Sequence, residues 1–262
     1  MNNREKEKLV KKLYEKYPYP SRIDSSEEKL KSFALWTAKT INENNTYWKG
    51  KTILELGCGT GELSVGIALC GGKVTAVDFS KASIKKAKLL ANKKCKQNKP
   101  KYFLRNILKL KENEFKKKFD IVIALGSLHH TINAKKGFEI GCKNLAKEGI
   151  MFIGLYNKYS RLRHRIKRIF VRIIAGDNIE KRIKIGKLFF NKKTQKERIA
   201  DKFGQIHESY HSINEILEWF KEQNMEFIGS KPNYKTPIID EINWLLKKRN
   251  AFFVMSGKKK LK

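Results

Sequence analysis

Hydrophobic positions along this chain form two alternating patterns from residue 52 onwards. Short continuous apolar runs, typical of strands buried on both faces, are separated by segments whose apolar residues recur at helical spacing. The runs that predict strands are TILEL (52–56), KVTAVDF (73–79), KYFLRNI (101–107), FDIVIALGS (119–127), IMFIGLYN (150–157), MEFIGS (225–230) and AFFVMSG (251–257). The segments that predict helices are 61–70, 83–94, 134–149 (closed by Gly149), 212–224 and 238–248.

This alternation of strands and helices predicts the fold class. Consecutive parallel strands need crossover connections, which place helices on both faces of a sheet. The final two strand runs are close together and favour an antiparallel edge pair. We therefore expect an α/β protein with a Rossmann-like, seven-stranded, mostly parallel sheet, an antiparallel last strand and a helical cap. The expected parts are an N-terminal helical cap (1–49), a ligand-binding core (50–157), a basic helical insertion (158–212) and a C-terminal part that completes the sheet (213–262).

The residues before the first strand predict two helices. Residues 3–16 are mostly polar and predict a solvated helix. Pro18 and Pro20 of YPYPS (17–21) end it, because they hold the backbone extended. Ser25 and Glu28 have the spacing of a capping box, so a second helix is expected from there to about Asn45.

Composition indicates a folded protein. The 262 residues are 40% hydrophobic and 11% aromatic, enough for a core. The four cysteines, Cys58, Cys70, Cys95 and Cys142, form no C-x-x-C pair, so neither a metal site nor a disulfide scaffold is expected. The N-terminus lacks the apolar stretch of a signal peptide, and no run of about 18 apolar residues predicts a transmembrane helix. We therefore expect reduced thiols and a cytoplasmic protein.

The formal net charge of +32 predicts attraction to polyanions such as RNA, DNA or an anionic membrane surface, although a lysine-rich surface can equally reflect proteome composition. Residues 158–198 carry 15 Lys or Arg against three acids. A basic amphipathic helix is expected there, with its stripe formed by Leu162, Ile166, Ile169, Phe170 and Ile173. Three interpretations stay open: a cap helix with a solvated basic face, a helix resting on anionic lipid, and an RNA-binding surface.

The run ILELGCGTGELS (53–64) places Gly57, Gly59 and Gly61 directly after the first predicted strand. In an open α/β sheet the ligand binds at the carboxyl ends of the strands, and glycines let backbone N–H groups approach it closely. No lysine follows Gly61, which excludes a phosphate-binding P-loop. Glu62 occupies the position of the third glycine of the dinucleotide fingerprint, and a glutamate there would repel a pyrophosphate. The loop therefore fits a nucleotide ligand without phosphates.

A second acid supports a nucleoside site. Asp78 ends the second predicted strand, where a carboxylate can accept hydrogen bonds from both ribose hydroxyls. It could instead cap the helix that follows, but Ser80 is already placed for that role. The glycine loop and this acid together indicate a nucleoside-binding site.

These motifs resemble those of class I S-adenosylmethionine-dependent methyltransferases. ELGCGTG and VDFS are similar to the first two motifs of the family, FDIVIALGSLHH to its fourth, and NLAKEGIMFIGLYN to the helix and strand that follow, so the resemblance covers about residues 50–157. It implies S-adenosylmethionine as the cofactor, with Asp78 on the ribose hydroxyls and Phe79 on the adenine. The family usually has an acid after the third strand that contacts the adenine amino group. Here the candidate is Asn106, whose side-chain carbonyl can accept the same hydrogen bond. The other cofactor-binding residues that the resemblance implies are Glu55, Gly57, Cys58, Gly59, Gly61, Leu125 and Gly126.

The residues after the fourth strand limit which methyl acceptors are possible. They contain neither the Asn/Asp-Pro-Pro-Tyr/Phe run usual in exocyclic-amine methyltransferases nor the cysteine nucleophile of cytosine-C5 enzymes. LHHT (128–131) is similar both to small-molecule methyltransferases and to tRNA wobble-uridine methyltransferases. His129 and His130 are candidate general bases near neutral pH, and a structural role under the cofactor is the alternative.

Three further segments predict a cap over the site: YPYPS (17–21), GLYNKYSRLRHR (154–165) and DKFGQIHESYHS (201–212). Together they resemble a poorly characterised bacterial and archaeal methyltransferase group. Tyr156 is a third catalytic candidate from these segments, Tyr19, Asn157 and His207 are substrate-pocket candidates, and Tyr17, Asp201 and His211 offer further polar and aromatic surface. We expect methyl transfer to a small-molecule or lipid-like acceptor. An RNA acceptor, above all tRNA, and a non-catalytic methyltransferase-like binding module are the alternatives.

Overall fold

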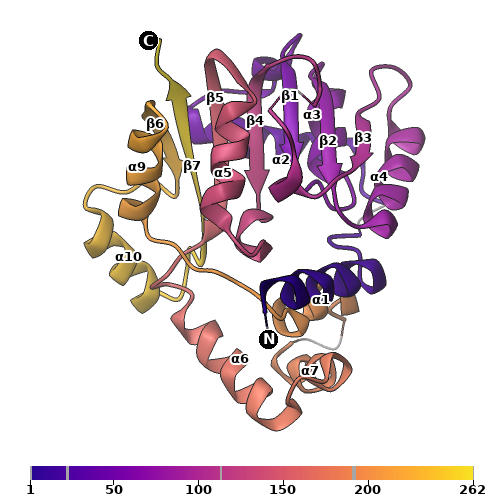
Figure 1. The fold of residues 1–262 in the computed structure, drawn as a ribbon, viewed down its shortest axis with the longest axis vertical. Helices are drawn as coiled ribbons and strands as arrows, with labels where there is room; N and C mark the ends of the chain where they lie inside the picture. Colours follow the sequence, from indigo (N-terminus) through magenta and orange to yellow (C-terminus); the bar gives the residue numbers. More distant parts are fainter. Residues whose placement is uncertain (1, 22–23, 113, 191–192, 262) are drawn as a thin grey trace.

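The computed structural model describes residues 2–21, 24–112, 114–190 and 193–261. A seven-stranded sheet lies at its centre, in the order β3-β2-β1-β4-β5-β7-β6 (Figure 1). Neighbouring strands from β3 to β5 pair in parallel, and β7 is antiparallel to both β5 and β6. This confirms the predicted Rossmann-like sheet with an antiparallel last strand. The strands are β1 (Thr52–Leu56), β2 (Lys73–Asp78), β3 (Lys101–Leu104), β4 (Phe119–Leu125), β5 (Leu145–Tyr156), β6 (Met225–Lys231) and β7 (Phe252–Lys259).

Helices cover both faces of the sheet because its central strands are apolar on both sides. Leu54 of β1 belongs to one hydrophobic cluster with Phe138 and Phe220, while its neighbour Ile53 belongs to a second with Leu30 and others. The helices are α1 (Asn3–Lys16), α2 (Glu27–Ala38), α3 (Glu62–Leu69), α4 (Lys81–Lys94), α5 (Ala134–Lys143), α6 (Leu162–Ala175), α7 (Ile179–Gly186), α8 (Lys196–Ile199), α9 (Ile213–Glu222) and α10 (Pro237–Leu246). None of the described helices is long and apolar enough to cross a membrane.

The helix predicted over 134–149 is shorter than expected. It ends at Lys143, because β5 already begins at Leu145 and pairs with Phe119 of β4. The register then shifts before Ile150 pairs with Ile121, so residues 145–149 belong to an irregular start of the strand.

The second N-terminal helix is also shorter than predicted. Its cap is Ser26 and not Ser25: the Ser26 side chain accepts the backbone N–H of Lys29 at 3.3 Å. The helix ends at Ala38 in a short 3₁₀ turn, and Asn42 in the left-handed region (φ 59°) stops that turn. The capping-box interpretation is therefore off by one residue.

Helix α1 lies across the carboxyl ends of the strands, with α6 and α7 beyond it (Figure 1). It was expected to be solvated, but its inner side shares a third hydrophobic cluster with both of those helices. The buried members of this cluster are Leu13, Tyr17, Val171, Ile183, Ile199, Ala200 and Phe203. The N-terminal helix and the basic insertion thus pack together on the ligand-binding edge of the sheet. The four-part division of the chain stays a prediction.

Candidate active site

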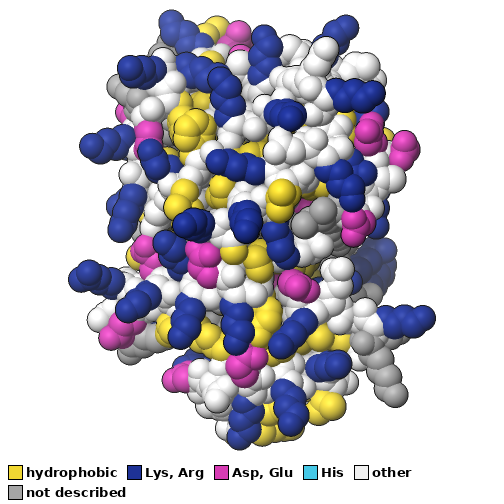
Figure 2. Space-filling model, turned by 90° about the vertical axis from the view of Figure 1, so that its right-hand side faces the viewer, with side chains coloured by type: hydrophobic (Ala, Val, Ile, Leu, Met, Phe, Trp, Pro, Cys, Tyr) yellow, Lys and Arg dark blue, Asp and Glu magenta, His cyan; other side chains and the backbone are white. Residues whose placement is uncertain are grey.

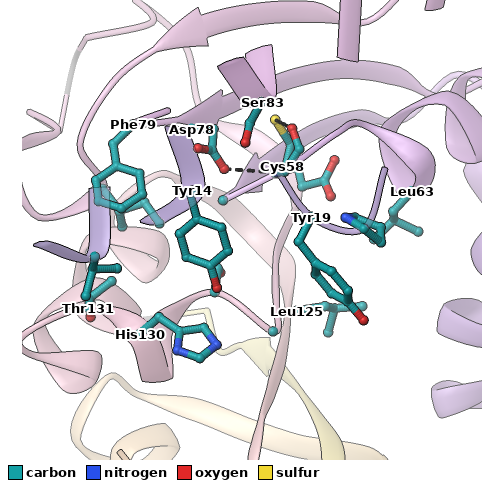
Figure 3. A pocket seen from close by; sticks show the side chains of 18 of the residues that line it. Tyr14, Tyr19, Cys58, Leu63, Asp78, Phe79, Ser83, Leu125, His130 and Thr131 are labelled. Atoms are coloured by element: carbon teal, nitrogen blue, oxygen red, sulfur yellow. Dashed lines mark hydrogen bonds between the residues drawn. The ribbon is translucent and has the colours of Figure 1, made fainter. Parts of the chain in front are cut away.

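A cavity of about 300 Å³ lies at the carboxyl ends of β1, β2 and β4, and side chains of α1 and α2 close it (Figure 3). This volume is at the lower end of the range for small-molecule sites. Most of the cofactor residues implied by the sequence line it. The predicted residues found in its wall are Tyr19, Glu55, Gly57, Cys58, Gly59, Asp78, Phe79, Asn106, Leu125, Gly126 and His130.

The glycine loop has two glycines in the cavity wall and one outside it. Gly57 and Gly59 have φ angles of 80° and 53°, and a Cβ atom on Gly59 would lie 2.4 Å from the carbonyl oxygen of Tyr19. Gly61 does not line the cavity, so its predicted contact with the cofactor is not supported. A Cβ on Gly61 would lie 2.8 Å from Cβ of Ala87, which shows that this glycine lets α3 and α4 pack closely.

Asp78 is buried where β2 ends, and its carboxylate is held by the backbone. Its Oδ2 accepts the N–H of Gly59 at 3.0 Å (Figure 3). Its Oδ1 accepts the N–H of Ser80 at 2.9 Å. Burial raises the pKa of Asp78 to about 6, although these hydrogen bonds favour the charged form. Ser80 caps α4 by accepting the N–H of Ser83, as predicted, so Asp78 is not needed as a helix cap.

Glu55 lies behind the glycine loop and differs from Asp78 in its partners. Its carboxyl group accepts a hydrogen bond from the hydroxyl of Ser64. Burial raises the pKa of Glu55 to about 8, so the group is mostly protonated at neutral pH and can itself donate a hydrogen bond. Burial also raises the pKa of the Cys58 thiol, which is therefore neutral and no nucleophile.

The cavity wall is acidic in a molecule whose net charge is +32. Among its titratable residues are four acids and one arginine: Glu7, Glu55, Glu62, Asp78 and Arg105. The arginine is already paired with Glu114, so the wall offers little to a phosphate. Acidic side chains and open glycine backbone instead fit a cationic nucleoside, and S-adenosylmethionine carries its positive charge on sulfur. The residues present therefore fit this cofactor.

Asn106 is placed differently from the prediction. Its side-chain carbonyl accepts the N–H of Leu108 at 2.9 Å and so caps a short 3₁₀ turn, which leaves one lone pair of that oxygen for a ligand. Its amide group donates to the carboxylate of Glu7 on α1. An acid does lie on this side of the cavity, but it comes from the N-terminal helix and not from the end of β3.

The two histidines after β4 have ring centroids 4.3 Å apart, but they differ in their access to the cavity. His130 lines the cavity, and its Nε2 has no hydrogen-bond partner among the described residues. The same Nε2 lies 3.8 Å from Oδ1 of Asp201, which accepts the hydroxyl of Tyr14 at 2.9 Å. Burial lowers the pKa of His130 to about 3, so its imidazole is neutral at neutral pH and is a weak base.

His129 and Tyr156 lie one layer behind the cavity wall. The His129 ring is fully buried, with its centroid 3.9 Å from that of Tyr156. The guanidinium of Arg161 lies 3.3 Å from the centroid of the Tyr156 ring. Neither residue lines the cavity, so a direct catalytic role is not supported for either of them.

Asn157 and His207 also lie outside the cavity wall. Asn157 is fully buried at the end of β5, where its amide donates to Glu241 and its carbonyl accepts the N–H of Ser160. These bonds organise the turn after β5 and leave no amide group for a substrate. The carbonyl oxygen of His207 lies 3.4 Å from Nδ1 of His130, and the His207 ring is hydrogen-bonded to the backbone of Thr131 in the cavity wall.

Sequence reasoning expected an N-terminal helical cap but missed which residues of its two helices line the cavity. Glu7, Val10 and Tyr14 of α1 recur with spacings of three and four residues and all line the cavity. This stripe is present in the sequence, but it is short and lies within a mostly polar helix. Phe33, Trp36 and Thr37 of α2 line the cavity in the same way.

The sheet order and the nucleoside-type cavity at its carboxyl edge define a class I S-adenosylmethionine-dependent methyltransferase. The chain belongs to the methyltransferase domain family, whose model matches residues 48–224. The family motifs identified in the sequence lie inside this range.

Curated relatives match a similar part of the chain. It is 32% identical over 148 residues to a ubiquinone biosynthesis O-methyltransferase of Pelagibacter ubique (strain HTCC1062), covering 56% of this chain and 56% of the relative. It is 31% identical over 126 residues to the protein of the same name from Glaesserella parasuis serovar 5 (strain SH0165), covering 46% and 52%. The chain thus spans about half the length of the curated relatives it matches.

Solved structures share the fold over almost the whole chain. Magnesium protoporphyrin IX methyltransferase from Synechocystis PCC 6803 with bound SAH matches 97% of this chain and 99% of its own, with a TM-score of 0.60 and 15% identity. A plantazolicin methyltransferase in complex with a substrate analogue and SAH matches 98% and 97%, with a TM-score of 0.55 and 17% identity. At these identities the likeness shows the fold alone.

Proposed function

We propose that this protein transfers the methyl group of S-adenosylmethionine to a hydroxyl oxygen of a small-molecule or lipid-like acceptor. The observation that carries the proposal is the buried imidazole of His130, whose Nε2 has no hydrogen-bond partner among the described residues and which shares one cavity with Asp78. The O-methyltransferases among the curated relatives support the choice of acceptor atom.

On the cofactor side, S-adenosylmethionine supplies an electrophilic methyl group on a positively charged sulfur. The wall acids other than the protonated Glu55 attract that charge, and the Asp78 carboxylate would hold the ribose hydroxyls. Gly57 and Gly59 let the backbone approach the ligand. Because the positive charge disappears as the methyl group leaves, positioning and exclusion of water contribute more to the rate than strong acid–base chemistry.

On the acceptor side, the hydroxyl group must lose a proton as it attacks. The neutral His130 imidazole accepts that proton at Nε2, and the carboxylate of Asp201 stabilises the resulting imidazolium. Tyr14 fixes Asp201 by donating its hydroxyl, and it receives the side-chain amide of Gln205 at 2.6 Å. These bonds connect α1 to the segment after α8, so the cap orients the base.

The cavity favours an aromatic acceptor. Aromatic side chains from four segments contribute to its wall, and flat apolar surfaces of this kind suit a phenol. They are Tyr14, Tyr19, Phe33, Trp36 and Phe79. A phenol also has a hydroxyl more acidic than that of an alcohol, which suits a base as weak as the buried His130.

The net charge of +32 favours RNA as a second candidate acceptor. Incubating the protein with methyl-labelled S-adenosylmethionine and separate fractions of phenolic lipids, water-soluble phenols, tRNA and protein distinguishes the candidates. We expect label in a phenolic fraction. Label in tRNA alone would overturn the proposal, and cofactor binding without label in any fraction would support a non-catalytic module instead.

The His130→Ala variant tests the assigned base. Loss of a general base should lower turnover by about 10²-fold or more and leave the affinity for S-adenosylmethionine nearly unchanged. His207→Ala is the matched control, because it keeps the backbone carbonyl near His130 and removes only a ring outside the cavity. Equal turnover in the wild type and His130→Ala contradicts the role of this imidazole.

A further inference from the structure

Helix α6 turns its apolar side to the solvent. Six large apolar residues recur at spacings of one, three and four residues, so they form one continuous face of the helix. Their exposed fractions are 41% for Leu162, 59% for Ile166, 59% for Ile169, 53% for Phe170, 76% for Ile173 and 44% for Ile174. A soluble domain normally buries such a face, so this one indicates an interaction surface.

The opposite side of α6 is the one that packs on the protein. Val171 and Ala175 are buried there. Arg161 and Arg168 also point inward, and both pair with the buried carboxylate of Glu208. The interpretation of α6 as a cap helix with a solvated basic face is therefore wrong for these two arginines, because Glu208 compensates their charge inside the cap.

Other basic residues flank the exposed apolar face. At about 100° per residue, Arg163 and Lys167 lie along one border of this face, while Arg165 and Arg172 lie along the other. Arg163, Lys167 and Arg172 are exposed. On the side of the molecule that lies to the right in Figure 1, Figure 2 shows the same mixture, with Lys and Arg side chains spread widely and apolar patches between them. Aliphatic residues bordered by cations are typical of helices that lie in a lipid interface.

We propose that α6 docks the protein on an anionic lipid surface, with its apolar face among the acyl chains and its basic borders at the headgroups. The basic charge of residues 158–198 favours a lipid surface over a second copy of the chain. Residues 158–198 carry 15 Lys or Arg against three acids, so two copies meeting across this face would repel each other. RNA would meet aliphatic side chains where it needs aromatic ones for stacking.

A second helix, α10, also exposes a row of apolar residues. Ile238, Ile239, Ile242 and Leu246 of α10 are 43–65% exposed, and the basic run of residues 247–249 follows directly. Figure 1 shows α6 and α10 beyond the carboxyl ends of the strands, at the end of the molecule away from the C-terminus. Docking through these helices does not depend on the acceptor: it holds for a water-soluble acceptor as well as a lipid-like one.

Flotation with vesicles tests the docking surface. The wild type should bind vesicles of phosphatidylcholine and phosphatidylglycerol, bind vesicles of phosphatidylcholine alone weakly, and lose binding as salt is raised. The double variant Ile169→Ser/Ile173→Ser should lower the partition coefficient by about 10-fold or more, because it removes apolar burial in the interface.

The matched control is Leu89→Ser/Leu261→Ser, which removes two leucines with exposed fractions of 51% and 63% outside α6 and α10. It should bind vesicles as the wild type does. Circular dichroism and the affinity for S-adenosylmethionine should be unchanged in both double variants. The proposal is overturned if the wild type ignores anionic vesicles, if both double variants lose binding equally, or if sedimentation shows a dimer that Ile169→Ser/Ile173→Ser dissociates.

Discussion

Asp78 and Glu55 are buried carboxyl groups in one cavity, yet their surroundings give them different protonation states. Asp78 accepts two backbone N–H groups, which limits the rise of its pKa to about 6, so it is mostly ionised at neutral pH. Glu55 receives the Ser64 hydroxyl, and its pKa of about 8 leaves it mostly protonated. One group can therefore accept ribose hydrogen bonds while the other donates.

Asp78→Ala tests the cofactor site. The variant should bind S-adenosylmethionine about 1.5–3 kcal/mol more weakly, as expected for lost hydrogen bonds to a charged group. Wild-type binding should itself weaken as pH falls through about 6, where Asp78 takes up a proton. Titration calorimetry measures both effects. Asp120→Ala is the control, because Asp120 lies near the start of β4, at the end of the strands away from the cavity. Wild-type affinity in Asp78→Ala would contradict the assigned cofactor site.

Glu55→Gln tests the protonation of Glu55 in the protein without cofactor. The folded pKa of about 8 lies above the ordinary glutamate value of 4.5, so the folded state binds more protons between these values and stability falls as pH rises through them. Glutamine cannot ionise, so the variant should lack this decline and be more stable than the wild type above pH 8. Thermal unfolding at a series of pH values checks this. Parallel profiles for the two proteins would show that Glu55 is already ionised.

Helix α1 is attached to the core partly through the end of another helix. The carboxylate of Glu15 accepts the N–H groups of Lys81 and Ala82 at 2.7 and 3.0 Å, so α1 supplies an acidic cap to α4. An acid at a helix N-terminus also interacts favourably with the helix dipole. The cap thus joins the helix that closes the cavity to the helix that follows Asp78.

Glu15→Ala should therefore loosen α1. Losing two charge-assisted hydrogen bonds should cost about 1–3 kcal/mol and speed amide exchange in α1 more than in the sheet. Cofactor affinity should fall several-fold, since α1 closes the cavity. Lys12→Ala, an exposed change on the same helix, should leave both properties unchanged. Uniform exchange rates across α1 in the three proteins would show that this contact does not hold the helix.

The sheet was predictable from sequence because its strands are apolar on both faces and follow each other at regular intervals. The end of α5 was not predictable, because residues 145–149 resemble a helix end locally and become strand only by pairing with β4. The same limit applies to α6: the sequence predicts its apolar and basic sides, but Glu208, more than thirty residues away, decides which side faces inward. Contacts between residues far apart in the sequence also place Glu7 and Tyr14 in the site.

Acidic residues are concentrated in the wall of the cavity, whereas the chain as a whole is strongly basic. The wall of the cavity holds four acids, while the chain as a whole carries a net charge of +32. The acids of the cavity attract a cationic cofactor at short range. The basic residues of the exterior attract an anionic surface from a distance. The two attractions use different residues, which lets docking and cofactor binding be altered independently.

The close approach of Gly59 to the carbonyl of Tyr19 affects which fragments of this protein can keep an intact binding site. The glycine loop lies within the family match of residues 48–224. The segment of Tyr19 that packs against this loop, and the helices that cover the cavity, precede residue 48. Strands β6 and β7, which finish the sheet, follow residue 224. A fragment trimmed to the matched range would keep the class I motifs of residues 50–157 and still lack the helices that close the cavity and two strands of the sheet.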